Sequence, residues 1–370
     1  MSGMSGISVE NLTKRFKDET VLDGVSFDVP KGGTLVLFGS SGAGKTVLLR
    51  CIAGAIEPEG GIVRIDGQDL HDVAPEKRGI GMAFQNFALF PHMSAFENIA
   101  APLRARRTRK AELKAGVEGV AKLLKIDHVL GHAPKALSNG QKQRTALARA
   151  LAAEPGVLLL DDPLRNVDAK LRFEMRLELP RLLAGRGATV IYVTQDYKEA
   201  MALGDRIAVL DGGKIVQMGT PEDIYRRPAS MGIARLFGDP TINLLDVVPE
   251  NGGGGIIARL SDHAVPLSPG LEAAVGRNCV LGIRPEAMAF SDDGDGVPVT
   301  IEAETPLNEK TVTLAKTMRG RELLVSRPAG TPAPVSGAAH VVIDASDVIL
   351  FDRTTGARIA PDLADAEAAA

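Results

Sequence analysis

The sequence predicts an α/β domain with a covered parallel sheet, followed by a smaller domain made of β-strands. The first observation is an alternation of short apolar runs with helical stretches, which continues to about Leu236. The second is a glycine-rich loop at 39–46, which joins an apolar strand to a helix. The third is a change after Asp239-Pro240, where the predicted strands become short and Pro- and Gly-rich segments connect them.

Each element of the α/β part is predicted from its local pattern. Residues 21–29 alternate apolar and polar side chains like a half-buried strand, whereas 34–38 is continuously apolar. Further strands are predicted at 62–65, 79–84, 157–161 and 189–193. Helices are predicted at 45–55, 104–124 and 141–153, the second of them with a charged, solvated face.

The remainder of the chain is predicted as a small β-barrel or sandwich, because short strands and turns follow one another at close spacing. A flexible turn is expected at 252–255, and the strands at 280–283, 297–301, 322–325, 340–343 and 348–351.

Composition narrows the classes of function. At roughly 150 residues per domain, the 370 residues allow about two or three domains. The 43 basic and 46 acidic side chains leave a formal net charge of -3, which argues against a nucleic-acid partner. Cys51 and Cys279 lie far apart and in no metal-ligand spacing, so we expect a reducing compartment and neither a disulfide scaffold nor a zinc site. No apolar run reaches the ~20 residues of a membrane span, so we expect a soluble protein whose membrane role comes through a partner.

The loop at 39–46 has the pattern G-x-x-x-x-G-K-[ST] and the strand–loop–helix context that this pattern requires. Its residues are Gly39, Ser40, Ser41, Gly42, Ala43, Gly44, Lys45 and Thr46. Glycines let successive N–H groups point at phosphate oxygens, and the helix that begins here adds the positive end of its dipole. Lys45 can reach the β- and γ-phosphates of a nucleotide, and the Thr46 hydroxyl can bind Mg²⁺. We call this segment the phosphate loop.

A second motif is the apolar strand at 157–160, which ends in Asp161 and Asp162. Asp161 can hold Mg²⁺ beside the phosphate loop. The motif alone is weak, because many buried strands end in Asp.

The third motif shows a resemblance to a known family. Leu137-Ser138-Asn139-Gly140-Gln141, directly before a helix, resembles the L-S-G-G-Q signature of ABC ATPases and differs from it only at Asn139. Other landmarks of that family occur in the expected order: Phe16 for the aromatic residue that stacks on adenine, Gln85 for the Q-loop glutamine and Asp168 for the D-loop aspartate.

The resemblance implies an ABC ATPase of the P-loop NTPase fold with ATP and Mg²⁺ as cofactors. Two such domains face each other head to tail, and each ATP is held by the phosphate loop of one and the signature of the other. The implied Mg²⁺ residues are Thr46, Gln85 and Asp161. The implied nucleotide contacts are the phosphate loop, Phe16, Gln85, Ser138, Asn139, Gly140, Gln141 and Asp168.

The segments at 86–94 and 97–99 look like the maltose-importer type of ABC ATPase and its carbohydrate-uptake relatives. The segments at 281–286 and 351–356 look like the TOBE-type, OB-like barrel of those importers. We therefore predict an ATPase domain at 1–238 with a helical subdomain at about 86–155, an all-β OB-like barrel domain at 239–358 and a frayed tail at 359–370.

The same resemblance implies partners and a location. They are a second ABC ATPase subunit, two membrane permease subunits contacted through Gln85 to Ile99, and indirectly an extracytoplasmic solute-binding protein. The location is peripheral, on the cytoplasmic face of the cell membrane. The solute class implied is a sugar, a polyol or a glycerol-like compound.

Two catalytic positions depart from the family pattern. Asp162 stands where the family has Glu, and Gln195 follows Tyr192-Val193-Thr194 where the family has His. Arg165 stands in the D-loop where the family usually has Ser. General-base catalysis is typically worth about 10²–10⁴-fold, and a shorter carboxylate forfeits part of that.

We therefore hypothesise a weakened hydrolytic site that still binds ATP and is paired with a second, intact ATPase in a heterodimer. A mainly regulatory or structural ATP-binding subunit remains an alternative. So does an importer ATPase for a polyamine, an anion or iron. An ABC ATPase without a transporter is disfavoured, because the chain has one cassette, no long heptad run and no basic excess.

Overall fold

The structure is a computed structural model that describes residues 5–185, 187–261, 263–291, 293–331 and 337–361. The chain divides into two compact units, Met1–Pro221 and Glu222–Ala370. The frayed tail expected at 359–370 falls, from 362 onward, outside the described residues. No helix within the described ranges is both long and apolar enough to cross a membrane.

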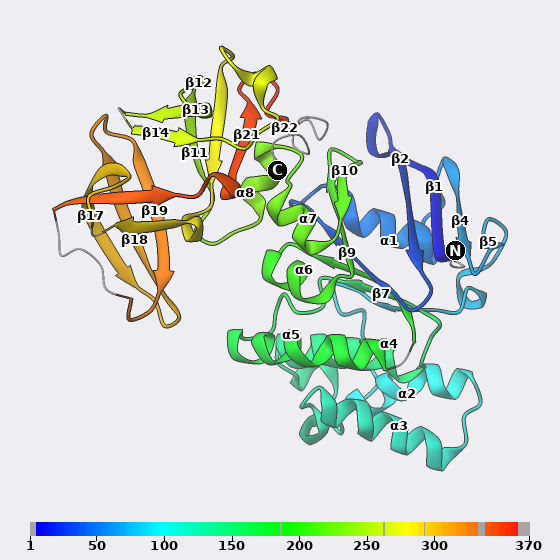
Figure 1. Ribbon diagram of the computed structural model, residues 1–370. Helices are drawn as coiled ribbons and strands as arrows, with labels where there is room; N and C mark the ends of the chain where they lie inside the picture. The colour runs from blue at the N-terminus through cyan, green and yellow to red at the C-terminus, as the bar shows by residue number, and fades with distance from the viewer. Residues whose placement is uncertain (1–4, 186, 262, 292, 332–336, 362–370) are drawn as a thin grey trace. The chain divides into compact units, whose positions relative to one another are not determined.

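The first unit is built around a six-stranded sheet in the order β10-β9-β3-β8-β7-β6 (Figure 1). Neighbouring strands are parallel except β9 and β10. The strands β7 and β8 are buried at every residue, as parallel strands covered on both faces are. The strands are β3 (Thr34–Phe38), β6 (Ile80–Ala83), β7 (Val157–Asp161), β8 (Thr189–Thr194), β9 (Arg206–Asp211) and β10 (Lys214–Gly219).

A second, antiparallel sheet of the first unit has the order β2-β1-β4-β5. Its strands are β1 (Ser5–Phe16), β2 (Glu19–Pro30), β4 (Gly60–Ile65) and β5 (Gln68–Asp69). Ile7, Val9 and Leu12 of β1 pack into one core with Leu48 and Leu49 of the helix that follows the phosphate loop. This sheet therefore fixes the helix from the side opposite the parallel strands.

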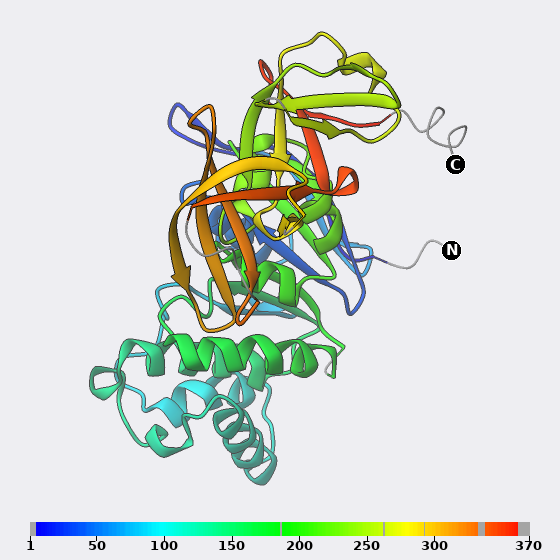
Figure 2. The same ribbon diagram turned by 60° about the vertical axis from the view of Figure 1, so that its left-hand side comes forward.

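The helices of the first unit are α1 (Lys45–Ala53), α2 (Ala95–Ala105), α3 (Lys110–Leu123), α4 (Asn139–Ala152), α5 (Ala169–Ala184) and α6 (Tyr197–Leu203). The short 3₁₀ turns are η1 (Pro75–Lys77), η2 (Asp127–Val129) and η3 (Pro134–Ala136). The helices α2, α3 and α4 contact one another and lie together in both views (Figures 1 and 2).

The prediction of a single helix at 104–124 is wrong. Arg104 belongs to the end of α2, and α3 begins only at Lys110. Between them the backbone of Arg107 has φ 57, a left-handed conformation that a helix cannot contain. The periodic charge pattern continues across this break, which is why the sequence did not show it.

The second unit begins with α7 (Pro221–Arg226) and α8 (Met231–Leu236) and continues as three antiparallel sheets. The first is β11 (Asn243–Val247), β15 (Cys279–Ile283), β21 (Val348–Asp352) and β22 (Arg358–Ile359). The second is β12 (Glu250–Gly252), β13 (Gly255–Leu260) and β14 (His263–Pro266). The third is β16 (Met288–Ser291), β20 (Ala338–Ile343), β17 (Val297–Pro306), β18 (Lys310–Thr317) and β19 (Glu322–Pro328). The turns η4 (Glu272–Ala274), η5 (Pro285–Ala287) and η6 (Ala345–Asp347) connect them.

One buried side chain joins two of these sheets. Asn243 of β11 donates to the carbonyl oxygens of Ile283 (3.2 Å) and Leu324 (2.9 Å), and it accepts from the Leu324 N–H (2.8 Å). All of its partners are backbone groups, so the Asn243 amide holds the backbone of β11 to the backbones of β15 and β19. The orange strands β17, β18 and β19 lie side by side in Figure 2.

Candidate nucleotide site

The phosphate loop leaves β3 at Phe38 and enters α1 at Lys45. Gly44 has φ 100, a conformation that side-chain-bearing residues rarely adopt. A Cβ on Gly39 would lie 2.3 Å from the carbonyl oxygen of Leu210, so the strand of Leu210 approaches too closely for any side chain. The glycines thus shape a bare backbone turn at the N-terminus of α1.

The Lys45 ammonium is folded back over this turn. Its Nζ donates to the carbonyl oxygens of Gly39 (2.7 Å) and Ser40 (2.6 Å). Burial lowers the pKa of Lys45, and the carboxylates of Asp162 and Asp161 oppose that shift. The cation is therefore positioned to exchange two carbonyls for phosphate oxygens, with which it interacts more strongly.

A cavity of about 210 Å³ lies in front of the phosphate loop. Its lining includes most of the residues that the sequence predicts for the phosphate loop, for binding Mg²⁺ and for hydrolysis. The lining consists of Val21, Ser41, Gly42, Gly44, Lys45, Thr46, Val47, Gln85, Asp161, Asp162, Arg165, Val193 and Gln195. Gly39, Ser40 and Ala43 shape the loop without lining the cavity, and the sequence reasoning missed Val21, Val47 and Val193.

The expected metal ligands meet at one wall of this cavity. The Thr46 hydroxyl donates to Asp161 Oδ1 over 3.1 Å, joining the first turn of α1 to the end of β7. Burial raises the pKa of Asp161, an effect that the Thr46 hydrogen bond opposes. A hydroxyl and a carboxylate with the Gln85 amide nearby are oxygen donors that suit Mg²⁺. The residues present fit a magnesium–nucleotide complex.

Asp162 lies in the same cavity on a strained backbone. Its φ is 49, and its N–H donates to the carbonyl oxygen of Val193 over 3.0 Å. Burial raises the pKa of the Asp162 carboxyl, while the nearby guanidinium of Arg165 acts in the opposite direction. Gln195 follows β8 and lines the cavity with it, so both departures from the family pattern face one space.

Phe16 lies at the end of β1, outside the lining of this cavity. The residue is 44% exposed, and Lys14 Nζ lies 5.2 Å from the ring centroid. An exposed aromatic face is what stacking on a nucleobase requires.

The signature segment also lies outside the lining of this cavity. Ser138 caps α4: its hydroxyl accepts from the Gln141 N–H (3.3 Å), and Gln141 Oε1 accepts from the Ser138 N–H (2.9 Å). Asn139 and Gly140 form the first turn of α4. Asp168 caps α5 by accepting from the Leu171 N–H at 3.0 Å. Two helix N-termini are thus preformed away from the chain's own phosphate loop.

The sequence reasoning missed a residue that connects these parts. Gln143 of α4 is 2% exposed and hydrogen-bonds to backbone groups of Asp162 and Asn166. The available signal was a further glutamine just past the signature, one helical turn before the apolar residues Ala146 and Leu147.

A second cavity, of about 680 Å³, lies over the segment expected to meet a permease. Ala88 and Phe90 come from that segment and Phe84 directly precedes it, whereas Pro102, Arg106 and Arg149 come from the helices α2 and α4 or from their ends. Arg149 donates to the carbonyl oxygens of Phe87 (3.2 Å) and Ala88 (2.7 Å). Phe90 is 42% exposed. The helical side of this groove was missed, because residues so far apart in sequence give no joint pattern.

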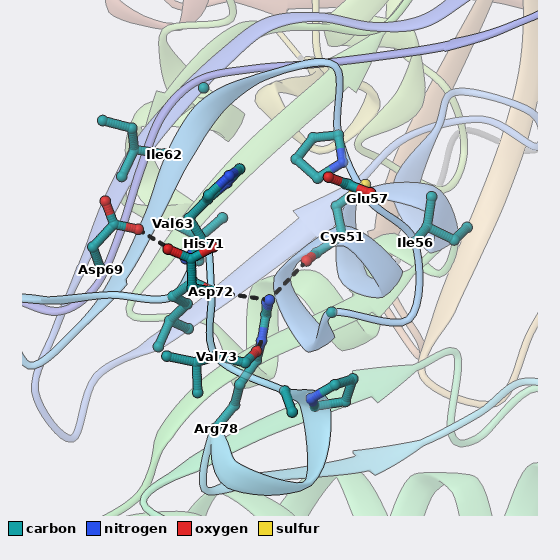
Figure 3. Close-up of a pocket in the computed structure, with 16 residues that line it drawn as sticks. Cys51, Ile56, Glu57, Ile62, Val63, Asp69, His71, Asp72, Val73 and Arg78 are labelled. Carbon is teal, nitrogen blue, oxygen red and sulfur yellow. Dashed lines mark hydrogen bonds between the residues drawn. The ribbon is translucent and has the colours of Figure 1, made fainter.

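A third cavity, of about 360 Å³, lies at the C-terminal end of α1 (Figure 3). Arg78 crosses it and donates to the carbonyl oxygens of Ile52 (2.8 Å), Leu70 (2.9 Å) and Val73 (2.9 Å), with a longer bond to Cys51 (3.3 Å). Burial raises the pKa of the Cys51 thiol to about 11. We interpret this region as the anchor of α1, since a cation suits the carbonyl end of a helix.

Comparison with known proteins agrees with this geometry. Residues 22–165 match the family model "ABC transporter", and residues 238–288 match "MalK OB fold domain". The sn-glycerol-3-phosphate import ATP-binding protein UgpC of Salmonella typhi is 39% identical over 366 residues, covering 96% of this chain and 100% of that protein. The protein of the same name from Escherichia coli O157:H7 is 39% identical over 365 residues, with the same coverage.

Among solved structures, the chain resembles the dimeric post-hydrolysis structure of the ATP-binding cassette MJ0796 bound to ADP and Pi. The TM-score is 0.55 at 30% identity, over 58% of this chain and 98% of that one. A second dimeric structure of MJ0796, described as a bacterial ABC transporter cassette, matches equally well. An α/β cassette with a phosphate loop, followed by a MalK-type OB-fold domain, therefore places the chain in the family of ATP-hydrolysing ABC transporter subunits, among the MalK-like importer ATPases.

Proposed function

We propose that this chain binds MgATP and hydrolyses it in a head-to-tail ATPase dimer, which drives import of a sugar, a polyol or a glycerol-like solute. The observation that carries the proposal is the hydrogen bond between Thr46 and Asp161 beside Lys45. It assembles an oxygen-rich metal position and a phosphate-binding cation at one helix N-terminus. The glycerol-like solute is supported by relatives named for sn-glycerol-3-phosphate import.

The dimer is proposed because the signature segment does not line the chain's own nucleotide cavity. Ser138 to Gln141 form a capped helix N-terminus that lies outside the lining of the chain's own nucleotide cavity. Such an N-terminus suits phosphate. A second chain turned head to tail would supply its phosphate loop to this N-terminus. Phe16 would stack on adenine, and Thr46, Gln85 and Asp161 would hold Mg²⁺.

Permease docking is proposed at the groove under Phe84, Ala88 and Phe90. Its lining is mostly apolar and includes the side chains of Glu76, Arg106 and Arg149, which suits an amphipathic helix that carries charged residues. The chain would then be peripheral on the cytoplasmic face of the membrane, with an extracytoplasmic solute-binding protein acting through the permeases.

A weakened hydrolytic site is the finer part of the proposal. Asp162 is shorter than the family's glutamate, and Gln195 carries no proton that titrates near neutral pH. The ion pair between Asp162 and Arg165 (3.8 Å) adds a competing partner for the carboxylate. We propose that a second ATPase with an intact site completes a heterodimer, in which Ser138 to Gln141 serve the partner's ATP.

The test begins with the purified full-length chain. We expect saturable binding of MgATP, lost in Lys45→Ala, with turnover far slower than that of an intact importer ATPase. Brisk turnover by the chain alone would rule out the weakened site and favour a homodimer. A chain that never turns over, even with its permeases and a second ATPase, would favour a regulatory ATP-binding subunit. Co-purification from the native membrane decides between hetero- and homodimer.

A further inference from the structure

Gln143 is a buried side chain whose two ends contact two different catalytic segments. It lies on α4, two residues after Gln141, and is 2% exposed. Its Nε2 donates to the carbonyl oxygen of Asp162 at 2.7 Å, and its Oε1 accepts from the Asn166 N–H at 3.0 Å. Only one orientation of the amide satisfies both bonds, because one end must donate and the other accept.

The first of these bonds holds a strained residue. Asp162 has φ 49, which costs about 1–2 kcal/mol for a residue with a Cβ. Its N–H is held by the carbonyl oxygen of Val193 (3.0 Å), and its carbonyl by Gln143. The direction of the Asp162 side chain therefore depends on both bonds, since the backbone alone would relax.

The second bond holds the turn that follows. The Arg165 N–H donates to the same Asp162 carbonyl (3.3 Å), and Asn166 is fixed by the other end of Gln143. Residues 162–166 thus form one turn around a single amide. Because Gln143 belongs to the helix that Ser138 begins, its amide connects this turn to the signature segment.

We propose that Gln143 is a positioning residue that ties the chain's own hydrolytic carboxylate and D-loop to its signature helix. Asp162, which acts on the chain's own ATP, and the signature segment, which acts on the partner's ATP, then move together. The proposal rests on the head-to-tail function proposed above. Asp162 acts on the water, and Gln143 acts only through Asp162 and the turn at 162–166.

Two variants separate the two bonds. Gln143→Leu removes both, at similar volume. Gln143→Glu keeps an oxygen to accept from the Asn166 N–H but, when ionised, has no proton for the Asp162 carbonyl. The matched control is Thr145→Val on the same helix: Thr145 is also fully buried, and its hydroxyl donates to the carbonyl oxygen of Gln141 within α4 (2.8 Å).

The full-length chain is measured by single-turnover hydrolysis of labelled ATP, by MgATP affinity and by amide hydrogen exchange over 162–168. In Gln143→Leu we expect hydrolysis to fall roughly 10- to 100-fold, as a misplacement of about 1 Å produces, with affinity within about twofold. Exchange at Asn166 should rise in Gln143→Leu and stay protected in Gln143→Glu. The glutamate variant should lose turnover only at a pH where its carboxyl is ionised, because the protonated acid can still donate to the Asp162 carbonyl. A purely structural role would instead lower affinity and turnover together.

Thr145→Val should match the variants in thermal stability but keep wild-type hydrolysis. A Gln143→Leu chain that loses no more turnover than Thr145→Val overturns the proposal, as does unchanged exchange at Asn166. Failure of the wider function looks different: the wild-type chain would then bind no MgATP, while the exchange measurement would still report on the bridge.

Discussion

Asp162 Oδ2 and Arg165 Nη1 lie 3.8 Å apart, so the residue proposed to act in hydrolysis is paired with a cation three residues later in the chain. The Arg165 side chain is 52% exposed, and partly exposed ion pairs are worth about 0.2–1 kcal/mol. We expect Arg165→Ser to raise single-turnover hydrolysis by no more than about fivefold, which is the rate equivalent of that energy. Arg165→Lys, which keeps the charge, is the control and should change little. A drop in rate with Arg165→Ser would show that the guanidinium assists the reaction.

Restoring the family's residues should have a larger effect than removing Arg165. Glu at 162 reaches one methylene further, and His at 195 can donate a titratable proton toward the γ-phosphate. We expect Asp162→Glu with Gln195→His to raise turnover by roughly 100-fold, within the range of general-base catalysis. Phosphate release under saturating MgATP measures this, with Lys45→Ala in the doubly substituted chain as the blank. A double variant no faster than wild type would place the limiting step elsewhere.

The buried carboxyl of Glu199 predicts a pH dependence of stability. Burial raises its pKa above the ordinary value of 4.5, although hydrogen bonds from Tyr192 (2.8 Å) and Thr194 (2.9 Å) oppose the shift. A carboxyl whose folded pKa lies above its unfolded pKa contributes stability below the unfolded value and loses it as the pH rises through the folded value. A Gln at this position is uncharged at every pH, as the protonated Glu199 carboxyl is.

We therefore expect Glu199→Gln to gain in free energy of unfolding, relative to wild type, as the pH rises from about 4 through the raised pKa of Glu199. Urea unfolding at a series of pH values gives the difference. A difference that does not change with pH would mean that Glu199 has the same pKa in the folded and unfolded chains.

Gly54 at the end of α1 offers a matched pair of glycine substitutions. Gly54 has φ 77, and a Cβ there would lie 2.6 Å from Cζ of Arg78. Gly67 has φ 81 and no atom within 4 Å of the same position. Gly67→Ala should cost only the left-handed backbone, about 1–2 kcal/mol.

Gly54→Ala should cost about 1–3 kcal/mol more, because Arg78 must leave the buried carbonyls that it satisfies. Denaturant unfolding of both variants measures the difference. Equal losses would show that Arg78 moves without breaking those bonds.

The parts of the nucleotide site that consist of consecutive residues could be predicted from the sequence. The phosphate loop and the strand ending in Asp161 follow local rules, so α1 and β7 begin and end within two residues of their predicted bounds. β1 was not predicted, because the alternation of apolar and polar residues breaks between Val9 and Leu12, where the strand has a register shift. The Gln143 bridge and the groove beside Arg149 depend on approaches across 19 or more residues, such as the bond from Gln143 to Asp162. The local periodicity of apolar residues does not predict contacts between residues so far apart in the sequence.

The capping box of Ser138 and Gln141 has a kinetic consequence. Both side chains are already engaged with the backbone of their own helix turn, so the segment holds its shape before any nucleotide reaches it. A preformed receptor loses little conformational entropy on contact. In the proposed dimer, the rate at which two such subunits close on ATP should then be governed by collision and orientation. This rate should depend little on local folding and should vary only weakly with mild denaturant.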